Sequence, residues 1–284
     1  MIPATFEYTV PTTLTEALIL LRHRPEARVM AGGQSLLSLM KLRAATPPMV
    51  IDLSKLRDLS YIREVKDHIA IGALTTHTEI EQSALIRDRL RALGEAAEQI
   101  GDLQVRNRGT IGGSLAHADP AADYPAAFLA LEGTAVAQGP GGTRTIPAEQ
   151  FFTGLFATAL QPGEILTEVQ FPTTPAISGS SYRKMKHPAS GFAIVGAAAV
   201  VRAGPEKREQ RVRLAFTGAA AHAFRANGVE TALRGKTIDE AAVRDAMAHA
   251  TDGVELLEDL SADPEYRAQL VRVYGRRALL AAVP

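Results

Sequence analysis

The first part of the chain alternates between strand-like and helix-like patterns of hydrophobic positions. "TTLTEALILLRHR" opens with a capping-box spacing and then repeats apolar residues at helical intervals. "ARVMAGGQSLLSLMKLR" predicts a short buried strand that ends at Ala31, a turn at Gly32 and Gly33, and a helix that starts near Ser35. "MVIDLSKL" adds another strand, so the pattern predicts a small α/β unit over residues 1–55.

The pattern changes over residues 56–175. Short β-rich runs, "HIAIGAL", "TAVAQG" and "EILTEVQFP", surround one long amphipathic stretch, "ALIRDRLRALGEAAEQIG". "GPGG" at 139–142 predicts a hairpin turn, because glycine accepts the positive φ angles of tight connections. We therefore expect an α+β unit, followed by a linker in "FPTTPAISGSS" near residues 172–181.

The last part, residues 176–284, divides into strands and then helices. The strand-like runs are "SSYRKMKH", "FAIVGAAAVV" and "QRVRLAFTGAA", with a charged turn, "RAGPEKRE", between the last two. The helical runs are "HAFRANGVETALRG", "TIDEAAVRDAMAHATDGV" and "DPEYRAQLVRVYGRRALLAAV". A three-stranded antiparallel sheet packed on helices is the simplest arrangement of these elements.

Composition narrows the classes of function. The chain has 284 residues, is 46% hydrophobic and balances 31 Lys and Arg against 31 Asp and Glu, so no net field favours nucleic acid or an anionic membrane. It contains no cysteine, which excludes disulfides, thiolate nucleophiles and iron–sulfur clusters held by this chain. No apolar run approaches the roughly 18 residues of a membrane span, and we expect a cytoplasmic location.

Two glycine loops are the first candidates for ligand binding. Gly32 and Gly33 lie between a predicted strand and helix, and Thr110–Ser114 repeats two adjacent glycines between hydroxyl residues. Only glycine lets the backbone approach a phosphate so closely, and two such loops could hold the two phosphates of one diphosphate. Taken alone, such a loop is more typical of an ordinary turn, and only the pair makes a ligand site as plausible. The P-loop and dinucleotide fingerprints are both missing.

Charged residues near the second loop allow several interpretations. Asp119 and Asp123 could form an acid/base couple, or each could cap a helix N-terminus, and at Asp123 the two roles could coexist. His117 lies between this loop and Asp119, and its role stays open. The histidines show no HExxH spacing, so we expect no zinc site.

The segment "SYRKMKHP" concentrates positive charge. On a strand, Lys184 and Lys186 share one face while Arg183 takes the other. A solvated face is the simpler interpretation, because exposed charges are the norm, and an anion or a partner is the alternative.

Together these segments resemble a known family. "MIPATFEYTVPTTLTEALILL", "AGGQSLLSLMKLR", "QVRNRGTIGGSLAHADPAADYPA", "GEILTEVQFP" and "YRKMKH" are similar to the FAD-binding medium subunit of the molybdenum hydroxylases, the carbon monoxide dehydrogenase/xanthine dehydrogenase group. The resemblance extends over essentially the whole chain. It implies an α+β fold in which a PCMH/vanillyl-alcohol-oxidase-type FAD domain with two subdomains (1–55 and 56–175) precedes a C-terminal flavoprotein domain (176–284).

The resemblance also implies which residues bind the cofactor. Both glycine loops would bind the FAD diphosphate, Asp123 would contact the cofactor, and Ile100 and Phe192 would pack on the isoalloxazine ring. Ser114 stands where many relatives have asparagine. The implied FAD-binding residues are Ala31, Gly32, Gly33, Gln34, Ser35, Leu36, Ile100, Thr110, Ile111, Gly112, Gly113, Ser114, Asp123, Leu166, Lys184 and Phe192. No catalytic or metal-ligating residue is implied.

The implied role is electron transfer within a larger enzyme. A large molybdopterin-binding subunit would oxidise the substrate, a small subunit with two [2Fe–2S] clusters would relay electrons, and this subunit would pass them to an external acceptor, in a dimer of heterotrimers. The absence of cysteine agrees with this division. Two alternatives stay open: a self-contained FAD-dependent reductase or oxidase of the same fold, and a cofactor-free binding scaffold. The sequence leaves the substrate and the acceptor undetermined.

Overall fold

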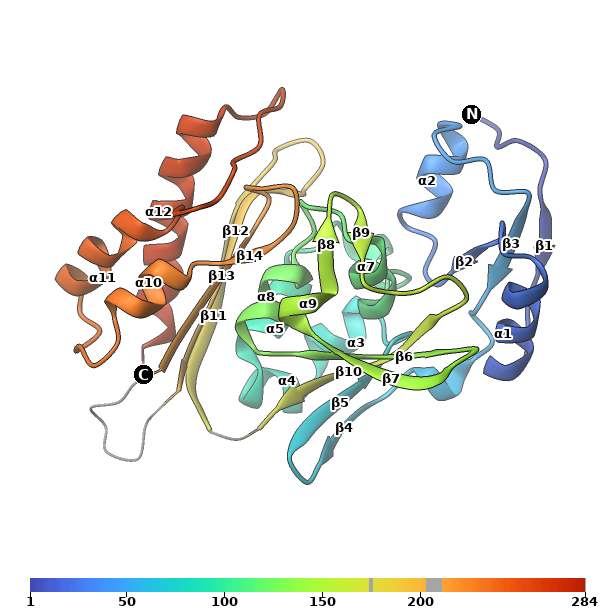
Figure 1. Ribbon diagram of the computed structural model, residues 1–284, viewed down its shortest axis with the longest axis horizontal. Helices are drawn as coiled ribbons and strands as arrows, with labels where there is room; N and C mark the ends of the chain where they lie inside the picture. Colours follow the sequence, from blue (N-terminus) through green and yellow to red (C-terminus); the bar gives the residue numbers. More distant parts are fainter. Residues whose placement is uncertain (174–175, 203–210, 284) are drawn as a thin grey trace.

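The main sheets of the molecule follow one another along its long axis (Figure 1). The computed structural model describes residues 1–173, 176–202 and 211–283. The predicted charged turn "RAGPEKRE" therefore lies outside the described residues, apart from Arg202. Of the helices in the described ranges, none combines the length and the apolar character that crossing a membrane requires.

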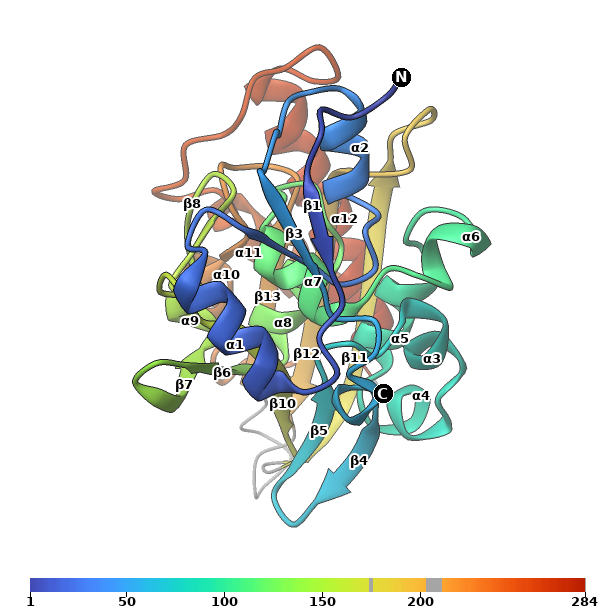
Figure 2. The ribbon, with the colours of Figure 1, turned by 90° about the vertical axis from the view of Figure 1, so that its right-hand side faces the viewer.

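The N-terminal unit is a small parallel sheet in the order β1-β3-β2 with helices beside it, which Figure 2 shows from the front. Strand β3 is buried along its length, and Ile51 and Leu56 pack with Ala17 and Leu21 of α1. The predicted strand–turn–helix around the first glycine loop is confirmed. The elements are β1 (Glu7–Thr9), α1 (Leu14–His23), β2 (Arg28–Met30), α2 (Leu36–Lys41), β3 (Met49–Asp52) and the 3-10 helix η1 (Arg57–Leu59).

The middle unit is an antiparallel sheet in the order β4-β5-β10-β6-β7 with helices packed on it. The expected hairpin at "GPGG" is confirmed, since Gly139 pairs with Gly142. The elements are β4 (Ile62–Val65), β5 (His68–Gly72), α3 (His77–Gln82), α4 (Ala84–Arg89), α5 (Arg91–Glu98), α6 (Leu103–Arg106), α7 (Ile111–His117), α8 (Tyr124–Ala130), β6 (Thr134–Gly139), β7 (Gly142–Pro147), α9 (Ala148–Phe151), β8 (Phe152–Gly154), β9 (Ala157–Thr158) and β10 (Ile165–Pro172).

The long amphipathic stretch of this unit is two helices rather than one. Leu90 breaks it, with a non-helical φ of −135° between α4 and α5. Leu90 is buried in the same core as Ile86 and Leu93. The change of direction at Leu90 thus brings apolar residues of both helices onto one core.

The C-terminal unit is an antiparallel sheet in the order β11-β12-β13-β14, in which the short β14 adds to the three expected long strands. Figure 1 shows α12 on one face of this sheet, with α5 and α8 on the other. The elements are β11 (Ile177–Lys186), β12 (Ala193–Arg202), β13 (Arg211–Thr217), β14 (Phe224–Arg225), α10 (Asn227–Ala232), α11 (Glu240–Ala246), the 3-10 helix η2 (Met247–His249) and α12 (Pro264–Ala282).

Burial on both faces explains the continuous apolar run of β12. Ala198 and Val200 belong to the core of the middle unit, whereas Ala197, Ala199 and Val201 pack with the C-terminal helices. Because successive strand residues point to opposite faces, a strand covered on both sides needs apolar residues at every position. The C-terminal sheet and the middle unit therefore share one core.

The segment expected as a linker near 172–181 is mostly ordered strand, since β11 begins at Ile177. Two of its serines, Ser180 and Ser181, make buried hydrogen bonds. The Ser180 hydroxyl accepts from the N–H of Ala92 at 3.1 Å, and the Ser181 hydroxyl donates to the carbonyl of Ala278 at 2.7 Å. These serine hydroxyls satisfy backbone hydrogen-bonding groups between packed layers. Composition alone does not distinguish such buried serines from the serines of a linker.

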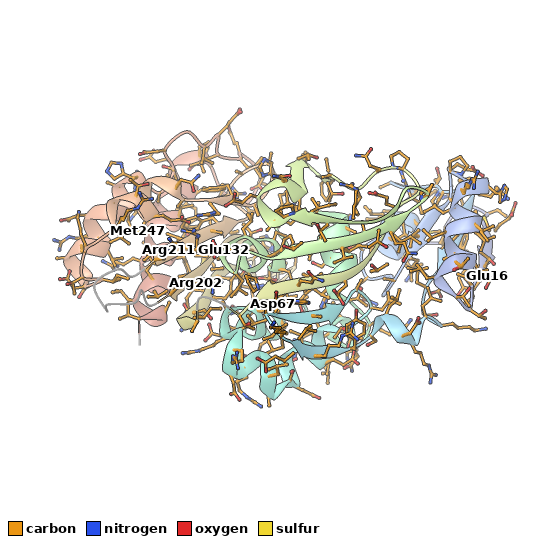
Figure 3. The ribbon with its side chains drawn as sticks, turned by 60° about the horizontal axis from the view of Figure 1, so that its bottom comes forward. Glu16, Asp67, Glu132, Arg202, Arg211 and Met247 are labelled. Atoms are coloured by element: carbon orange, nitrogen blue, oxygen red, sulfur yellow. The ribbon has the colours of Figure 1, made fainter. Side chains whose placement is uncertain are left out.

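Ion pairs join the two units at the seam of the shared core. Glu132 contacts Arg202 at 3.2 Å and Arg213 at 2.8 Å. Figure 3 places Glu132 and Arg202 at this seam, with Glu16 of α1 at the far end of the molecule. The middle and C-terminal units are thus connected by both apolar packing and charge.

Candidate functional site

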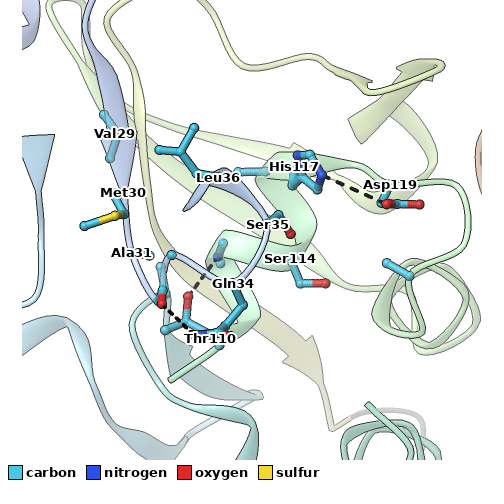
Figure 4. A pocket seen from close by; sticks show the side chains of 18 of the residues that line it. Val29, Met30, Ala31, Gln34, Ser35, Leu36, Thr110, Ser114, His117 and Asp119 are labelled. Atoms are coloured by element: carbon cyan, nitrogen blue, oxygen red, sulfur yellow. Dashed lines mark hydrogen bonds and ion pairs between the residues drawn. The ribbon is translucent and has the colours of Figure 1, made fainter. Parts of the chain in front are cut away.

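A cavity of about 630 Å³ is lined by the N-terminal unit, by α7 and other parts of the middle unit, and by residues 190–192 in the loop between β11 and β12. Both glycine loops line it, although they are far apart in the sequence (Figure 4). The expectation that the two loops meet in space is therefore confirmed.

The loops approach so closely that side chains would not fit. A Cβ atom on Gly32 would collide with the carbonyl oxygen of Arg108, just before the second loop. A Cβ atom on Gly112 would lie 2.6 Å from the carbonyl oxygen of Ala73, in the turn after β5. Glycine is required at both positions because backbone occupies the space that a side chain would fill.

The first loop presents unused backbone donors. Among the described residues, none accepts a hydrogen bond from the N–H groups of Gly33, Gln34, Ser35 or Leu36. Gly33 has a φ of +75°, which a glycine adopts without strain. A cluster of free N–H groups beside a cavity is suited to bind an anion.

In the second loop, the backbone N–H groups of residues 111–114 already donate hydrogen bonds within the protein. The N–H groups of Ile111 and Gly112 donate to carbonyl oxygens of the turn after β5, at 3.1 and 2.9 Å. Those of Gly113 and Ser114 donate to the hydroxyl and carbonyl oxygens of Thr110, at 3.1 and 3.0 Å. The two loops resemble each other in sequence. The second loop, however, contributes close backbone packing and hydroxyl groups to the cavity rather than free N–H groups.

Ile100, Asp123, Leu166 and Phe192 also line the cavity, and we call this group of residues the ring end. Leu166 is buried, and Phe192 is 44% exposed. Two apolar side chains from distant segments, Ile100 and Phe192, thus border a site that also holds a buried carboxylate.

That carboxylate, Asp123, has partners from the C-terminal sheet. It accepts a hydrogen bond from the Tyr182 hydroxyl at 2.6 Å and pairs with the Lys184 ammonium at 2.8 Å. Burial raises the pKa of the Asp123 carboxyl, and the ammonium and the hydroxyl act against that rise. Asp123 is the N-cap residue of α8, as expected, but its carboxylate makes no cap hydrogen bond to the helix, so the expected capping interaction is absent.

The segment before Asp123 is held by the C-terminal sheet as well. The Thr217 hydroxyl lies 2.7 Å from the carbonyl oxygens of both Pro120 and Ala122. The N–H of Gly218 donates to the Pro120 carbonyl at 2.6 Å. The C-terminal unit therefore fixes the backbone that positions Asp123.

Asp119 and His117 lie on the cavity wall (Figure 4). Asp119 accepts from the N–H of Ala121 at 2.9 Å, which is a turn rather than the expected helix cap. The His117 Nε2 atom lies 4.0 Å from Asp119, and the imidazole packs at 5.3 Å from the ring of Phe156. These contacts give His117, whose role the sequence left open, a place in the wall.

His77 is a lining residue that sequence reasoning missed. It is buried, its Nδ1 atom lies 3.1 Å from the Tyr124 hydroxyl, and its Nε2 atom faces Gly109. Burial, and to a smaller extent Arg106, lowers the pKa of His77 to about 3, so the imidazole is neutral near pH 7. No spacing in the sequence singles this histidine out.

Of the residues implied by the resemblance, all but Ile111 and Lys184 line the cavity. Ile111 is fully buried in the core of the middle unit. Lys184 is buried behind the cavity wall, so the interpretation of its strand face as solvated is wrong at this position. Lys186, on the same face, is exposed. Tyr182, also missed, shares the strand face of Lys184, and that two-residue spacing could have revealed it.

The lining fits a flavin dinucleotide. One end has free N–H donors and glycines that bring backbone close to a ligand, as a diphosphate requires. The other end combines apolar side chains with an acceptor-only carboxylate, as a planar ring with N–H groups requires. The volume lies in the range of cofactor sites, about 300–1,000 Å³.

Comparison with known proteins defines the class. Residues 4–174 match the family model described as the FAD binding domain in molybdopterin dehydrogenase, and residues 180–282 match the CO dehydrogenase flavoprotein C-terminal domain. The chain belongs to the family of FAD-binding medium subunits of the molybdenum hydroxylases. It is an oxidoreductase subunit, and its cofactor is FAD.

Individual relatives are similar over nearly their full length. The carbon monoxide dehydrogenase medium chain of Hydrogenophaga pseudoflava is 39% identical, covering 99% of this chain and 98% of the relative. The 6-hydroxypseudooxynicotine dehydrogenase complex subunit alpha of Paenarthrobacter nicotinovorans is 36% identical over 100% and 96%. A solved carbon monoxide dehydrogenase from Hydrogenophaga pseudoflava superimposes with a TM-score of 0.94 at 40% identity, covering 99% and 98% of the two chains.

Proposed function

We propose that this chain passes electrons from [2Fe–2S] clusters of a small partner subunit through its FAD to an external acceptor, within an enzyme whose large subunit holds the molybdenum cofactor. The observation on which this rests is that a cavity suited to FAD occurs in a chain with no cysteine. Iron–sulfur clusters require cysteine thiolates, so clusters that donate electrons to this FAD would belong to another chain.

The residues of the cavity would place and shield the cofactor. The free N–H groups of Gly33 to Leu36 would bind the diphosphate, and Ile100 and Phe192 would border the ring and exclude water. Asp123 would accept a hydrogen bond from the ring, since Tyr182 and Lys184 leave it acceptor capacity. FAD, when bound, supplies the redox chemistry that this chain's side chains lack.

The relatives support a multi-subunit assembly. Their names describe the medium chain of a carbon monoxide dehydrogenase, a subunit of a 6-hydroxypseudooxynicotine dehydrogenase complex and the medium subunit of a nicotine 6-hydroxylase. These names differ in substrate while the chains remain similar, which agrees with a substrate site on the large subunit. We propose the same division here, with a dimer of heterotrimers as the assembly.

Anaerobic mixing with the partner subunits tests this function. The chain, loaded with FAD, is mixed with its small subunit in the reduced state, and the visible flavin absorbance is followed by stopped flow. We expect bleaching that requires the small subunit. A loaded chain that oxidises or reduces a small molecule through repeated turnovers without partners, and that the small subunit fails to reduce, would instead establish the self-contained flavoenzyme.

A further inference from the structure

The Lys184 ammonium lies at the centre of a buried junction behind the ring end. Its side chain is fully buried, and its Nζ atom lies 2.8 and 3.0 Å from the two carboxylate oxygens of Asp123. The same atom donates to the carbonyl of Gln99 at 2.8 Å and to the carbonyl of Gly191 at 2.9 Å. An ammonium has three N–H donors, so all of them are used within the protein.

The acceptors belong to segments far apart in the sequence. Gln99 follows α5 and immediately precedes Ile100, Asp123 precedes α8, and Gly191 immediately precedes Phe192. Ile100, Asp123 and Phe192 are the residues that line the ring end. One side chain from β11 therefore holds each of the three segments that border the flavin ring.

A direct contact between Lys184 and a ligand would break this junction. Lys184 is not part of the cavity lining, and a bond to a ligand would remove one of its protein acceptors. Losing an acceptor would leave a buried carbonyl or the Asp123 carboxylate without its partner, which is costly in a water-free interior.

We propose that Lys184 is a positioning residue that sets the geometry of the ring end through Ile100, Asp123 and Phe192 without touching the flavin. The proposal rests on the assignment of the flavin ring to this end of the cavity. It differs from the role implied by family resemblance, in which Lys184 binds the cofactor directly.

Hydrogen exchange on the full-length chain without FAD tests the junction independently of cofactor binding. In Lys184→Met, amide exchange in residues 99–101 and 187–192 should accelerate together, by about tenfold or more, since both segments lose the same anchor. Lys66→Met, at an exposed position in the turn between β4 and β5, should match the wild type. Unchanged exchange in either segment, or equal acceleration in Lys66→Met, would overturn the proposal.

A second variant guards against loss of the fold from an unpaired buried carboxylate. In Asp123→Asn/Lys184→Met the charge is removed from both partners, so the fold should persist, while the carbonyls of Gln99 and Gly191 still lose their donor. We expect fast exchange in both segments of this double variant as well. Wild-type protection in a folded double variant would show that Lys184 serves only as a counter-ion.

The flavin provides a spectroscopic signature that a purely global loss of stability would not change. At saturating FAD, the visible circular dichroism of bound flavin in Lys184→Met should differ from that of the wild type and of Lys66→Met. Identical spectra in all three would contradict a role in ring geometry. A wild-type chain that binds no FAD would overturn the proposed function, and the exchange experiment would still decide the junction.

Discussion

The two ends of the cavity are built in different ways. The glycine end, which consists of the two glycine loops, uses backbone from the N-terminal and middle units, where close approach depends on the absence of side chains. The ring end uses side chains of three segments that a charged residue of the C-terminal sheet holds together. A site for one dinucleotide thus combines a rigid backbone cradle with a network that crosses the seam between units.

The largest effect should come from crowding the glycine end. Gly32→Val places a side chain on the carbonyl of Arg108, so the loops must separate. We expect FAD binding to be abolished and the free energy of unfolding to fall by about 1–3 kcal/mol, the usual cost of overpacking. The flavin content of the purified protein checks this. The control is Gly141→Val, at a hairpin position where a Cβ atom meets nothing within 4 Å; a yellow, stoichiometric Gly32→Val protein would break the cradle model.

The next effect concerns His77, a residue of the cavity lining that lies against Gly109 and beside Tyr124. Its pKa is about 3 in the folded chain and about 6.5 in the unfolded chain. The unfolded state therefore binds the proton first, so stability is full above pH 6.5 and falls as the pH drops toward 3, by up to about 1.4 kcal/mol per pH unit.

Urea unfolding at a series of pH values measures that slope. His77→Gln should flatten the acid limb, whereas His23→Gln, at an exposed position of α1, should leave it unchanged. An acid limb of equal steepness in wild type and His77→Gln would show that another group controls acid stability.

Thr217→Val, in β13 of the C-terminal sheet, should weaken the ring end although Thr217 itself belongs to another unit. It removes the hydroxyl that reaches the carbonyls of Pro120 and Ala122, next to Asp123. We expect a loss of about 1–2 kcal/mol in the free energy of unfolding, because a buried acceptor loses its donor. Weaker FAD binding should accompany it. Thr145→Val on the exposed strand β7 is the matched control. Equal unfolding free energies and equal FAD affinities in the two variants would argue against support of the site by the C-terminal unit.

The smallest effect should follow Ser114→Ala at the glycine end. The hydroxyl lines the cavity, yet the second loop is held by Thr110 and the backbone. Binding of FAD should weaken by less than about tenfold, the value of roughly one hydrogen bond. A loss as large as that of Gly32→Val, measured by the same FAD titration, would show that the second loop depends on side-chain donors after all.

The contrast between the two ends also explains which features of the site can be predicted from the sequence. Gly32 and Gly112 are recognisable because close backbone approach permits only glycine, and the strand–turn–helix pattern around the first loop follows from local periodicity. The bonding within the second loop is not visible in the sequence, since the acceptors for Ile111 and Gly112 lie in a turn some 36 to 39 residues earlier.

Long-range contacts account for the remaining differences. Asp123 has the local signature of a helix cap, but Tyr182 and Lys184 from β11 hold its carboxylate instead. Lys184 itself is typical of an exposed strand in sequence, and only the packing of β11 against α5 and against the segment that holds Asp123 buries it. Local patterns predict the elements well here, whereas they cannot reveal partners that the tertiary fold supplies.

Competition between ADP and FAD tests the separation of the two ends most directly. ADP carries the diphosphate but no flavin ring, so its dissociation constant, measured by calorimetry, reports on the glycine end. We predict that Gly32→Val loses both ligands, while Lys184→Met binds ADP as the wild type does and binds FAD at least about tenfold more weakly. Equal weakening of ADP and FAD in Lys184→Met, or wild-type ADP binding by Gly32→Val, would contradict the account.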